Sequence, residues 1–265
     1  MSTDPYSALA AGYDFVMAHV DYDAWAAYLF DLLRRHGEDV ETVVELGGGT
    51  GTLARRLQAL GDYEYVLTDG AAAMLDRARE KLPAGSPIRC VQADFRTVTL
   101  EDLGREAPVD AVVLVYDGLN YLVDASDVEA LLRSIHRLLR PGGLAIVDQS
   151  TPANSRTHHD AFVDEGATDG FAYVRENRYD PETRRHETIF ELTVDGEHYT
   201  ERHVQRAYAR QEVRTLIERS PLVAEAAYDA LTTDPATDDS YRVHWVLRRP
   251  PPPRSAPSPT DREDG

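Results

Sequence analysis

Residues 42–51 of the chain read TVVELGGGTG, a β-branched run that ends in a cluster of four glycines. A helical pattern over residues 53–60 follows directly, so the glycine cluster joins a strand to a helix. Glycine allows a sharp turn there and lets a ligand approach the main chain and the helix N-terminus closely. A glycine cluster alone is often only a loop, but after the first strand of a β-α-β unit it predicts a nucleotide-type binding site.

The segments around this loop alternate between strand and helix signals from residue 40 to residue 150. We expect strands at 42–46, 65–68, 88–92, 111–115 and 144–147, and helices at 53–60, 71–82 and 128–139. The run AVVLV at 111–115 is almost wholly apolar, which is typical of a central parallel strand. With an antiparallel pair expected near 222–228 and 241–247, the order predicts a Rossmann-like, seven-stranded, mostly parallel sheet flanked by helices.

A different pattern interrupts this order between residues 165 and 208. Two-residue alternation replaces the helix signals from Phe171 to Tyr208, with turn markers at Asp180-Pro181 and Asp195-Gly196. We interpret residues 165–208 as an antiparallel β insertion that packs against the sheet edge, or forms a lid or a subunit contact in a homodimer.

The two ends of the chain also differ from the central region. We expect residues 1–40, which contain an amphipathic helix at 22–35, to form an N-terminal helical lid of a single domain over 1–249. The proline-rich residues 250–265 lack an apolar anchor and are predicted to be a disordered tail.

Composition narrows the class of protein. The chain has 46 Asp and Glu against 28 Lys and Arg, and this net charge of −18 argues against a nucleic-acid binder that works by counterion release. No run of 18 apolar residues predicts a membrane span, and the first residues lack a basic start and an apolar stretch. A single cysteine, Cys90, excludes an internal disulfide and a multi-cysteine zinc site. We therefore expect a cytoplasmic protein that binds neither nucleic acid nor membrane and holds no metal.

Two acidic residues follow later strands of the expected sheet. Asp69 ends the second strand and could accept hydrogen bonds from both hydroxyls of a ribose, or cap the helix that begins at Ala71. Asp94 follows the third strand and could accept a bond from an adenine amino group while Phe95 packs on the ring, or be an ordinary turn aspartate. We favour the nucleotide interpretation because the glycine loop already predicts a nucleotide nearby.

The order of these motifs resembles the class I S-adenosylmethionine-dependent methyltransferases. The resemblance is carried by Glu45 with the Gly47–Gly51 loop, Asp69 with Met74-Leu75 after it, Ala93-Asp94-Phe95, and Leu139-Arg140-Pro141-Gly142-Gly143. Further matches, to a small-molecule-type bacterial branch, lie at Tyr6, Ala10, Tyr13-Asp14, Val20-Asp21-Tyr22, Trp25, Asp117–Tyr121 and Arg206–Tyr208. The likeness extends over residues 6–248. Its motifs are specific for the cofactor and poorly specific for the methyl acceptor.

The resemblance implies S-adenosylmethionine as the cofactor and an in-line transfer of its methyl group to a nucleophilic N, O, S or C atom of a small molecule. It also implies the residues that hold each part of the cofactor. Glu45, Gly47, Gly48, Gly49 and Gly51 would hold the methionine part, Asp69 the ribose, Gly70 and Met74 the adenosine, Asp94 and Phe95 the adenine, and Tyr116 the sulfonium end, with Tyr13 and Trp25 closing the site from above. One departure is Ala71, where relatives often carry a serine that caps the following helix.

A general base is harder to assign from the sequence. His158 and His159 follow the fifth strand on the side where an acceptor should bind, and one of them could take a proton, although solvated loop histidines are more common. Asp117 and Asn120, after the fourth strand, could hold the acceptor or form a turn that caps the next helix.

Two other functions stay open at this point. An NAD(P)-dependent oxidoreductase is disfavoured because Thr52 stands where the dinucleotide pattern requires glycine. The sole lysine, Lys81, also lacks the tyrosine four residues before it that one such family uses. A non-catalytic cofactor-binding scaffold would act through the insertion and the tail, and would bind the cofactor without transferring its methyl group.

Overall fold

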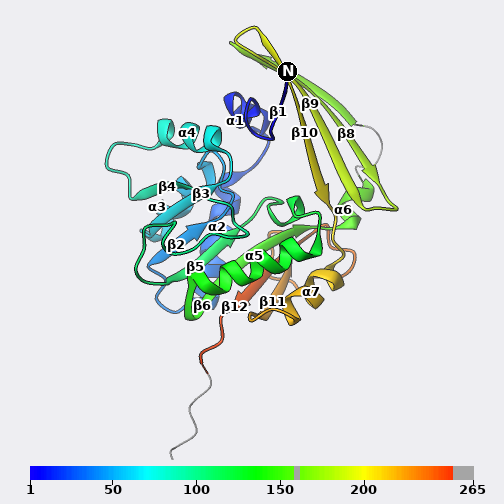
Figure 1. Ribbon diagram of the computed structural model, residues 1–265. Helices are drawn as coiled ribbons and strands as arrows, with labels where there is room; N and C mark the ends of the chain where they lie inside the picture. The colour runs from blue at the N-terminus through cyan, green and yellow to red at the C-terminus, as the bar shows by residue number, and fades with distance from the viewer. Residues whose placement is uncertain (158–161, 253–265) are drawn as a thin grey trace, which may run out of the picture.

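The computed structural model describes residues 1–157 and 162–252, which form two β-sheets with flanking helices (Figure 1). Within these residues the larger sheet has seven strands in the order β11-β12-β6-β5-β2-β3-β4. They are β2 (Thr42–Glu45), β3 (Glu64–Asp69), β4 (Ile88–Gln92), β5 (Val109–Leu114), β6 (Leu139–Ser150), β11 (Val223–Asp229) and β12 (Arg242–Arg248). Strands β2 to β6 pair in parallel, whereas β12 is antiparallel to β6 and to β11. The predicted Rossmann-like, seven-stranded, mostly parallel sheet is therefore confirmed.

Helices cover both faces of this sheet. One face carries α2 (Tyr22–His36), α3 (Thr52–Gly61) and α4 (Ala72–Lys81), and the other carries α5 (Ala125–Leu138) and α7 (Arg210–Glu218). Successive residues of a strand point to opposite faces, so Val43 packs with the first group and Val44 with the second. Each of these buried side chains contributes about 1.5–3 kcal/mol relative to exposure. No helix within the described residues has the length and apolar character that a membrane crossing requires.

The smaller sheet is the predicted antiparallel insertion, and it begins slightly earlier than expected. It is formed by β7 (Phe162–Thr168), β8 (Phe171–Asp180), β9 (Arg185–Val194) and β10 (Glu197–Arg206), each antiparallel to the next. The turn at Asp195-Gly196 has φ values of 50° and 87°, as the left-handed residues of a tight hairpin require. A short strand, β1 (Ser2–Thr3), pairs in parallel with β10. Local sequence patterns do not predict this pairing, because it joins residues almost 200 positions apart.

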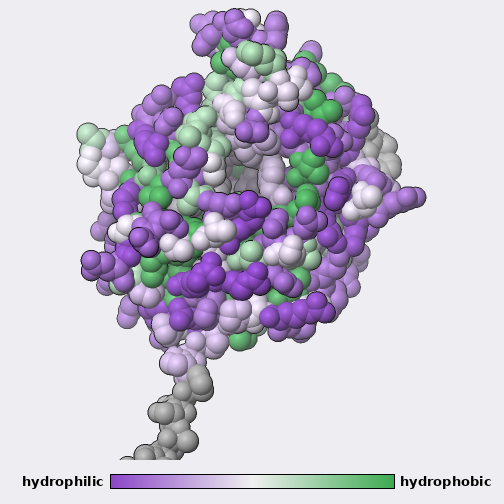
Figure 2. All heavy atoms as spheres, in the orientation of Figure 1, coloured by the Kyte–Doolittle hydropathy of each residue, from purple (hydrophilic) through white to green (hydrophobic). Residues whose placement is uncertain are grey.

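Short elements connect the two sheets. The 3-10 helix η1 (Leu9–Ala11) and the helix α1 (Tyr13–Val16) pack apolar side chains against the smaller sheet, where Leu9, Val16 and Phe171 share one cluster. A second 3-10 helix, η2 (Leu119–Tyr121), follows β5, and α6 (Pro152–Thr157) follows β6. Residues before α2 thus lie against the smaller sheet, whereas α2 packs on the larger one. The face in Figure 2 is mostly hydrophilic and is hollowed between the two sheets.

Candidate functional site

A cavity of about 1080 Å³ opens at the carboxyl ends of strands β2 to β5, the edge at which open α/β sheets bind ligands. Residues 4–7 of the N-terminal segment, together with Gly118, Tyr121 and Leu122 around η2, also line it. Eleven of the residues expected to hold a cofactor lie in its wall: Tyr13, Glu45, Gly47, Gly48, Gly49, Asp69, Gly70, Met74, Asp94, Phe95 and Tyr116. Motifs from four separate strand ends therefore meet in one place.

The glycine loop is shaped by positions that only glycine occupies easily. Gly47, Gly49 and Gly51 have φ values of 63°, 58° and 72°. A Cβ on Gly48 would lie 2.1 Å from Cδ1 of Leu67, so the loop has no room for a side chain there. Gly51 does not line the cavity; it begins α3 and packs against β3 and α4. Its contribution is the turn into the helix rather than a surface for a ligand.

Asp69 lines the cavity and bonds to the backbone of two neighbouring segments. Its Oδ2 accepts the N–H of Gly49 (2.9 Å), and its Oδ1 accepts the N–H of Ala71 (2.8 Å), where Ala71 offers no side-chain cap of its own. Burial raises the pKa of this carboxyl group, and the backbone N–H donors oppose that rise. Asp69 therefore fixes the glycine loop to the start of α4 while it lines the cavity.

Glu45 is a buried acid in the wall of the cavity. Its Oε2 accepts a hydrogen bond from the Tyr65 hydroxyl at 2.8 Å. Burial raises its pKa to about 8, with a further contribution from Asp69, and the Tyr65 bond acts in the opposite direction. A cationic group placed in the cavity beside Glu45 would favour its ionised form.

Asp94 is an exposed acid in the cavity wall. Its carboxylate accepts hydrogen bonds from Nε of Arg96 at 2.9 and 3.0 Å, and Arg96 holds the pKa of Asp94 below its usual value. Phe95 lies next to Gly47, with ring atoms 3.9 Å from the position of a Cβ there. Arg96 thus favours the ionised form of Asp94, and both Asp94 and Phe95 lie in the cavity wall.

Tyr13 is placed over the glycine loop by its neighbour in α1. The Asp14 carboxylate accepts hydrogen bonds from the Thr50 hydroxyl (2.6 Å) and from the Lys81 ammonium group (2.5 Å). These contacts tie α1 to the loop and to the end of α4, so the Tyr13 ring is held in the cavity wall.

Tyr116 stands at a strained turn that a buried acid supports. Tyr116 and Asp117 have φ values of 64° and 69°, and Oδ2 and Oδ1 of Asp148 accept their N–H groups at 2.9 and 3.1 Å. Arg242 of β12 bonds to Asp148 and pairs with Asp117 at 2.7 Å. Burial raises the pKa of Asp148 to about 6 although Arg242 opposes the rise. Asp148 was not predicted from the sequence, where its only signal is an acid at the end of the apolar run LAIVD at 144–148.

Trp25 does not close the cavity from above, which corrects the expectation from the resemblance. Its ring is buried 5.5 Å from the Tyr116 ring and 5.3 Å from that of His244, and the Arg242 guanidinium lies 5.4 Å from it. Trp25 therefore supports Tyr116 from within the core and is not part of the cavity wall.

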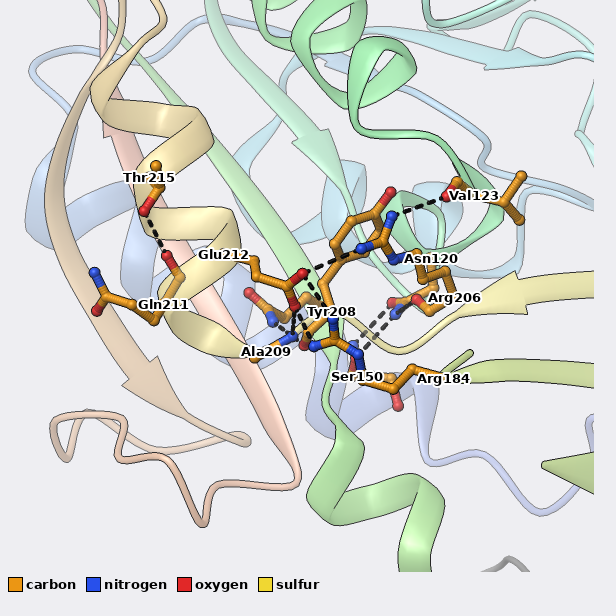
Figure 3. Close-up of polar contacts among 11 residues, drawn as sticks. Asn120, Val123, Ser150, Arg184, Arg206, Tyr208, Ala209, Gln211, Glu212 and Thr215 are labelled. Carbon is orange, nitrogen blue, oxygen red and sulfur yellow. Dashed lines mark hydrogen bonds and ion pairs between the residues drawn. The ribbon is translucent and has the colours of Figure 1, made fainter. Parts of the chain in front are cut away.

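The predicted acceptor-side residues fall in different places. His158 and His159 lie outside the described residues. Asp117 is paired with Arg242, and neither Asp117 nor Asn120 lines the cavity. Nδ2 of Asn120 donates to the carbonyl oxygens of Ser150 and Arg206, both at 2.8 Å, and its Oδ1 accepts the Ser150 N–H at 2.9 Å (Figure 3). Asn120 is thus a buried tie between η2 and the two strands that lead into and out of the smaller sheet.

Glu212 completes this junction at the start of α7. Its carboxylate pairs with Arg184 from the β8–β9 turn and with Arg206 at the end of β10, and it accepts the Ala209 N–H at 2.8 Å (Figure 3). Arg206 also donates to the carbonyl oxygen of Val123 at 3.2 Å. The smaller sheet is therefore anchored to the larger one by partly buried polar contacts.

Comparison with known proteins gives a consistent result. Residues 43–143 match the family model described as a methyltransferase domain. A putative methyltransferase of Bacillus subtilis (strain 168) is 34% identical over 54% of this chain and 54% of its own length. A dTDP-3-amino-3,4,6-trideoxy-alpha-D-glucopyranose N,N-dimethyltransferase of Streptomyces venezuelae is 30% identical over 48% and 50%. The chain thus spans about half the length of these two relatives. A solved S-adenosylmethionine-dependent methyltransferase from Clostridium acetobutylicum ATCC 824 has the same fold, with a TM-score of 0.76, 18% identity, and coverage of 90% of this chain and 96% of that one.

Proposed function

The chain belongs to the class I S-adenosylmethionine-dependent methyltransferases, and we propose that it transfers the methyl group of this cofactor to a nucleophilic N, O, S or C atom of a small molecule. The observation that carries the proposal is the convergence of the glycine loop, Asp69 and Tyr116 on one cavity at the carboxyl edge of the sheet. That cavity is at the upper end of the volumes that ligand sites usually have, which leaves room for an acceptor beside the cofactor.

The cavity wall fits each part of the cofactor with a suitable group. Glu45 and the loop offer an acid and backbone groups to the methionine part, and Asp69 offers carboxylate oxygens to the ribose hydroxyls. Gly70 and Met74 border the adenosine, Asp94 and Phe95 meet the adenine, and Tyr116 and Tyr13 face the sulfonium end. We assign these roles as a proposal that mutagenesis can test residue by residue.

When bound, S-adenosylmethionine supplies an activated methyl group on a sulfonium ion. The chain's own contribution is then alignment and exclusion of water, because a well-positioned nucleophile about 3–3.5 Å from its target removes much of the barrier. The faces of Tyr13 and Tyr116 can orient a cation at modest strength. Stronger stabilisation of the sulfonium would oppose the reaction, since its positive charge disappears during transfer.

The finer parts of the proposal concern the acceptor and the setting. A small-molecule acceptor is supported by the relative from Streptomyces venezuelae, whose name specifies an amino sugar. The net charge of −18 opposes nucleic acid as a partner, and the single cysteine suits the reducing cytoplasm. A homodimer through the β insertion is supported by Val163 and Val174, which are 58% and 41% exposed on β7 and β8.

The first experiment separates the three functions left open by the sequence. S-adenosylhomocysteine and NADH are added separately in a thermal-shift assay, and only S-adenosylhomocysteine is expected to raise the Tm, because a ligand that binds only the folded state stabilises it. Labelled-methyl transfer to the small-molecule fraction of a cell extract, followed by product mass, then identifies the acceptor. Stabilisation by NADH alone would support the oxidoreductase, and binding without transfer to any fraction would support the scaffold.

A further inference from the structure

A line of hydrogen bonds leads from the cavity into the smaller sheet. The hydroxyls of Tyr6 and Tyr121, both in the cavity wall, lie 2.5 Å apart. The Tyr121 hydroxyl is 3.0 Å from Nδ1 of His203, and Nε2 of His203 is 3.1 Å from Oε2 of Glu201. Three separate parts of the chain, namely the N-terminal segment, η2 and β10, thus contribute to one continuous path.

The inner end of this path is shielded from solvent. His203 is 3% exposed and Glu201 is 0% exposed. Among the described residues, the titratable groups in contact with the His203 ring are Tyr6, Tyr121 and Glu201, while β9 presents the apolar ring of Phe190 at 5.3 Å. The imidazole is therefore almost closed to solvent, and its Nδ1 faces the Tyr121 hydroxyl of the cavity wall.

The charges along the path suit the movement of a proton. Burial would raise the pKa of Glu201, but the His203 bond and the N–H groups of the N-terminal segment outweigh it and hold the pKa below its usual value. Burial raises the pKa of Tyr6 and Tyr121 well above the ordinary range, so both are neutral hydroxyls that can accept and donate at once. A fixed carboxylate beyond the ring stabilises an imidazolium, as in other base-orienting pairs.

We propose that Tyr6, Tyr121, His203 and Glu201 form a proton relay that takes the proton released by the methyl acceptor, an inference that rests on the proposed methyl transfer. The acceptor class is one whose nucleophilic atom carries a hydrogen that must leave, such as an N–H or O–H group. Tyr6 and Tyr121 are the residues that face the acceptor, whereas His203 and Glu201 act through them.

The steps balance as follows. The acceptor atom forms its bond to the methyl carbon as the carbon–sulfur bond breaks, and the sulfur keeps the electron pair. The acceptor's proton passes to the Tyr6 oxygen, the Tyr6 proton to the Tyr121 oxygen, and the Tyr121 proton to Nδ1 of His203. The resulting imidazolium remains beside the Glu201 carboxylate until the product leaves, and the proton then returns along the same path to water in the cavity.

Glu201 also has a structural role that any test must separate from the relay. Its carboxylate accepts the N–H groups of Tyr6 (2.7 Å), Ala8 (2.6 Å) and Leu9 (3.0 Å), and it thereby holds Tyr6 at a φ of 67°. A clamp of this kind needs the carboxylate and a donor at position 203. It does not need a ring that can take up a proton.

The decisive variant is therefore His203→Gln, whose amide can still donate to Glu201 but cannot bind a proton at neutral pH. Rates are measured with labelled S-adenosylmethionine and one preparation of the small-molecule fraction of a cell extract. At saturating S-adenosylmethionine we expect the rate to fall at least about 100-fold, because the amide cannot take up the proton. The affinity for S-adenosylhomocysteine should not change. Tyr121→Phe should show the same pattern.

The control is His198→Gln on the same strand, whose Nδ1 lies 3.0 Å from the Thr193 hydroxyl outside the path. It should retain the wild-type rate and the wild-type affinity for S-adenosylhomocysteine. A wild-type rate in His203→Gln would overturn the relay, as would a parallel loss of rate and S-adenosylhomocysteine affinity, which is the signature of a clamp alone.

A measurement without an acceptor separates the relay from the proposed function. Imidazole nitrogen resonances should show that Nδ1 of His203 accepts the Tyr121 hydrogen bond and that Nε2 carries the proton donated to Glu201. The opposite tautomer, with the proton on Nδ1, overturns the relay even if the wild type transfers methyl groups. Absence of any transfer by the wild type, despite S-adenosylhomocysteine binding, overturns the proposed function and the relay with it.

Discussion

The two walls of the cavity are held by contacts of very different range along the chain. On the wall formed by the strand ends, Asp69 bonds to Gly49, 20 residues away, and to Ala71, two residues away. On the wall that faces the smaller sheet, Tyr121 bonds to Tyr6 across 115 residues and to His203 across 82. The first wall is made largely of backbone at tight turns, and the second of side chains from separate elements.

This difference in range predicts in which wall a substitution leaves the geometry of the other wall unchanged. A loop fixed by neighbours in sequence forms wherever its strand and helix form. A wall made by long-range contacts depends on how the smaller sheet is anchored to the larger one. We therefore expect substitutions at the anchor to affect stability and transfer, and substitutions at the strand ends to affect cofactor affinity.

The largest effect is expected from Asn120→Ala, which removes the tie between η2 and the smaller sheet. Three buried hydrogen bonds are lost, and each partner left unsatisfied costs about 1–3 kcal/mol, so we expect a decrease of about 3 kcal/mol in the free energy of unfolding. Urea titration measures it. Gln211→Ala, at an exposed position on α7, is the control and should stay within about 0.5 kcal/mol of the wild type.

The same variant tests the independence of the walls. Under conditions where Asn120→Ala is folded, it should bind S-adenosylhomocysteine with wild-type affinity. A large loss of affinity would show that the strand-end wall also depends on the anchor, so that the two walls of the cavity are not independent.

The next effect concerns the pH dependence of cofactor binding through Glu45. Its pKa of about 8 means that the acid must lose a proton to pair with the ammonium group of the methionine part. Affinity should therefore rise by up to about tenfold per pH unit from pH 6 and level off above about pH 8. Calorimetric titration of S-adenosylhomocysteine measures this slope, and Glu45→Gln should flatten it. An equal slope in both proteins would exclude Glu45 as its source.

The ligand-free protein should show the opposite trend from the same group. A carboxyl group whose pKa is raised on folding binds more protons in the folded state, so its contribution to stability is lost as pH rises from about 4.5 through about 8. The free energy of unfolding of the wild type, relative to that of Glu45→Gln, should therefore decrease as the pH rises from about 4.5 to about 8.

A somewhat smaller effect is expected from Asp69→Ala. Loss of a charge-assisted contact to the ribose is worth about 1.5–3 kcal/mol, so cofactor affinity should weaken at least about tenfold by calorimetry. Asp76→Ala is the matched control, because Asp76 is exposed on α4 and pairs only with Arg79 in the contacts described. Unchanged affinity in Asp69→Ala would contradict the ribose assignment. Asp69 would then serve only to hold the Gly49 and Ala71 N–H groups.

The same contrast explains what the sequence could and could not predict. The strand-end wall was predictable because its motifs each follow a recognisable strand within a few residues. Asp148 was not predicted and Trp25 was expected in a different place, because their contacts with Tyr116 and Arg242 join separate elements of the fold. The Tyr121–His203 contact was missed for the same reason: two-residue alternation predicts an antiparallel insertion at 165–208, but not which of its residues meets Tyr121.

The smallest effect, and the sharpest test of where the cofactor lies, is expected from Gly70→Ala. A Cβ at Gly70 would have no heavy atom within 4 Å, in contrast to the 2.1 Å contact that a Cβ on Gly48 would make with Leu67. Thermal stability without ligand should therefore stay at the wild-type value. A methyl group there would project into space that we assign to the adenosine, so affinity for S-adenosylhomocysteine should fall by about 1 kcal/mol, or roughly fivefold. Since the substitution changes no contact within the protein, loss of affinity without loss of stability reports occupation of that space by the ligand. An unchanged affinity would move the adenosine away from the end of β3.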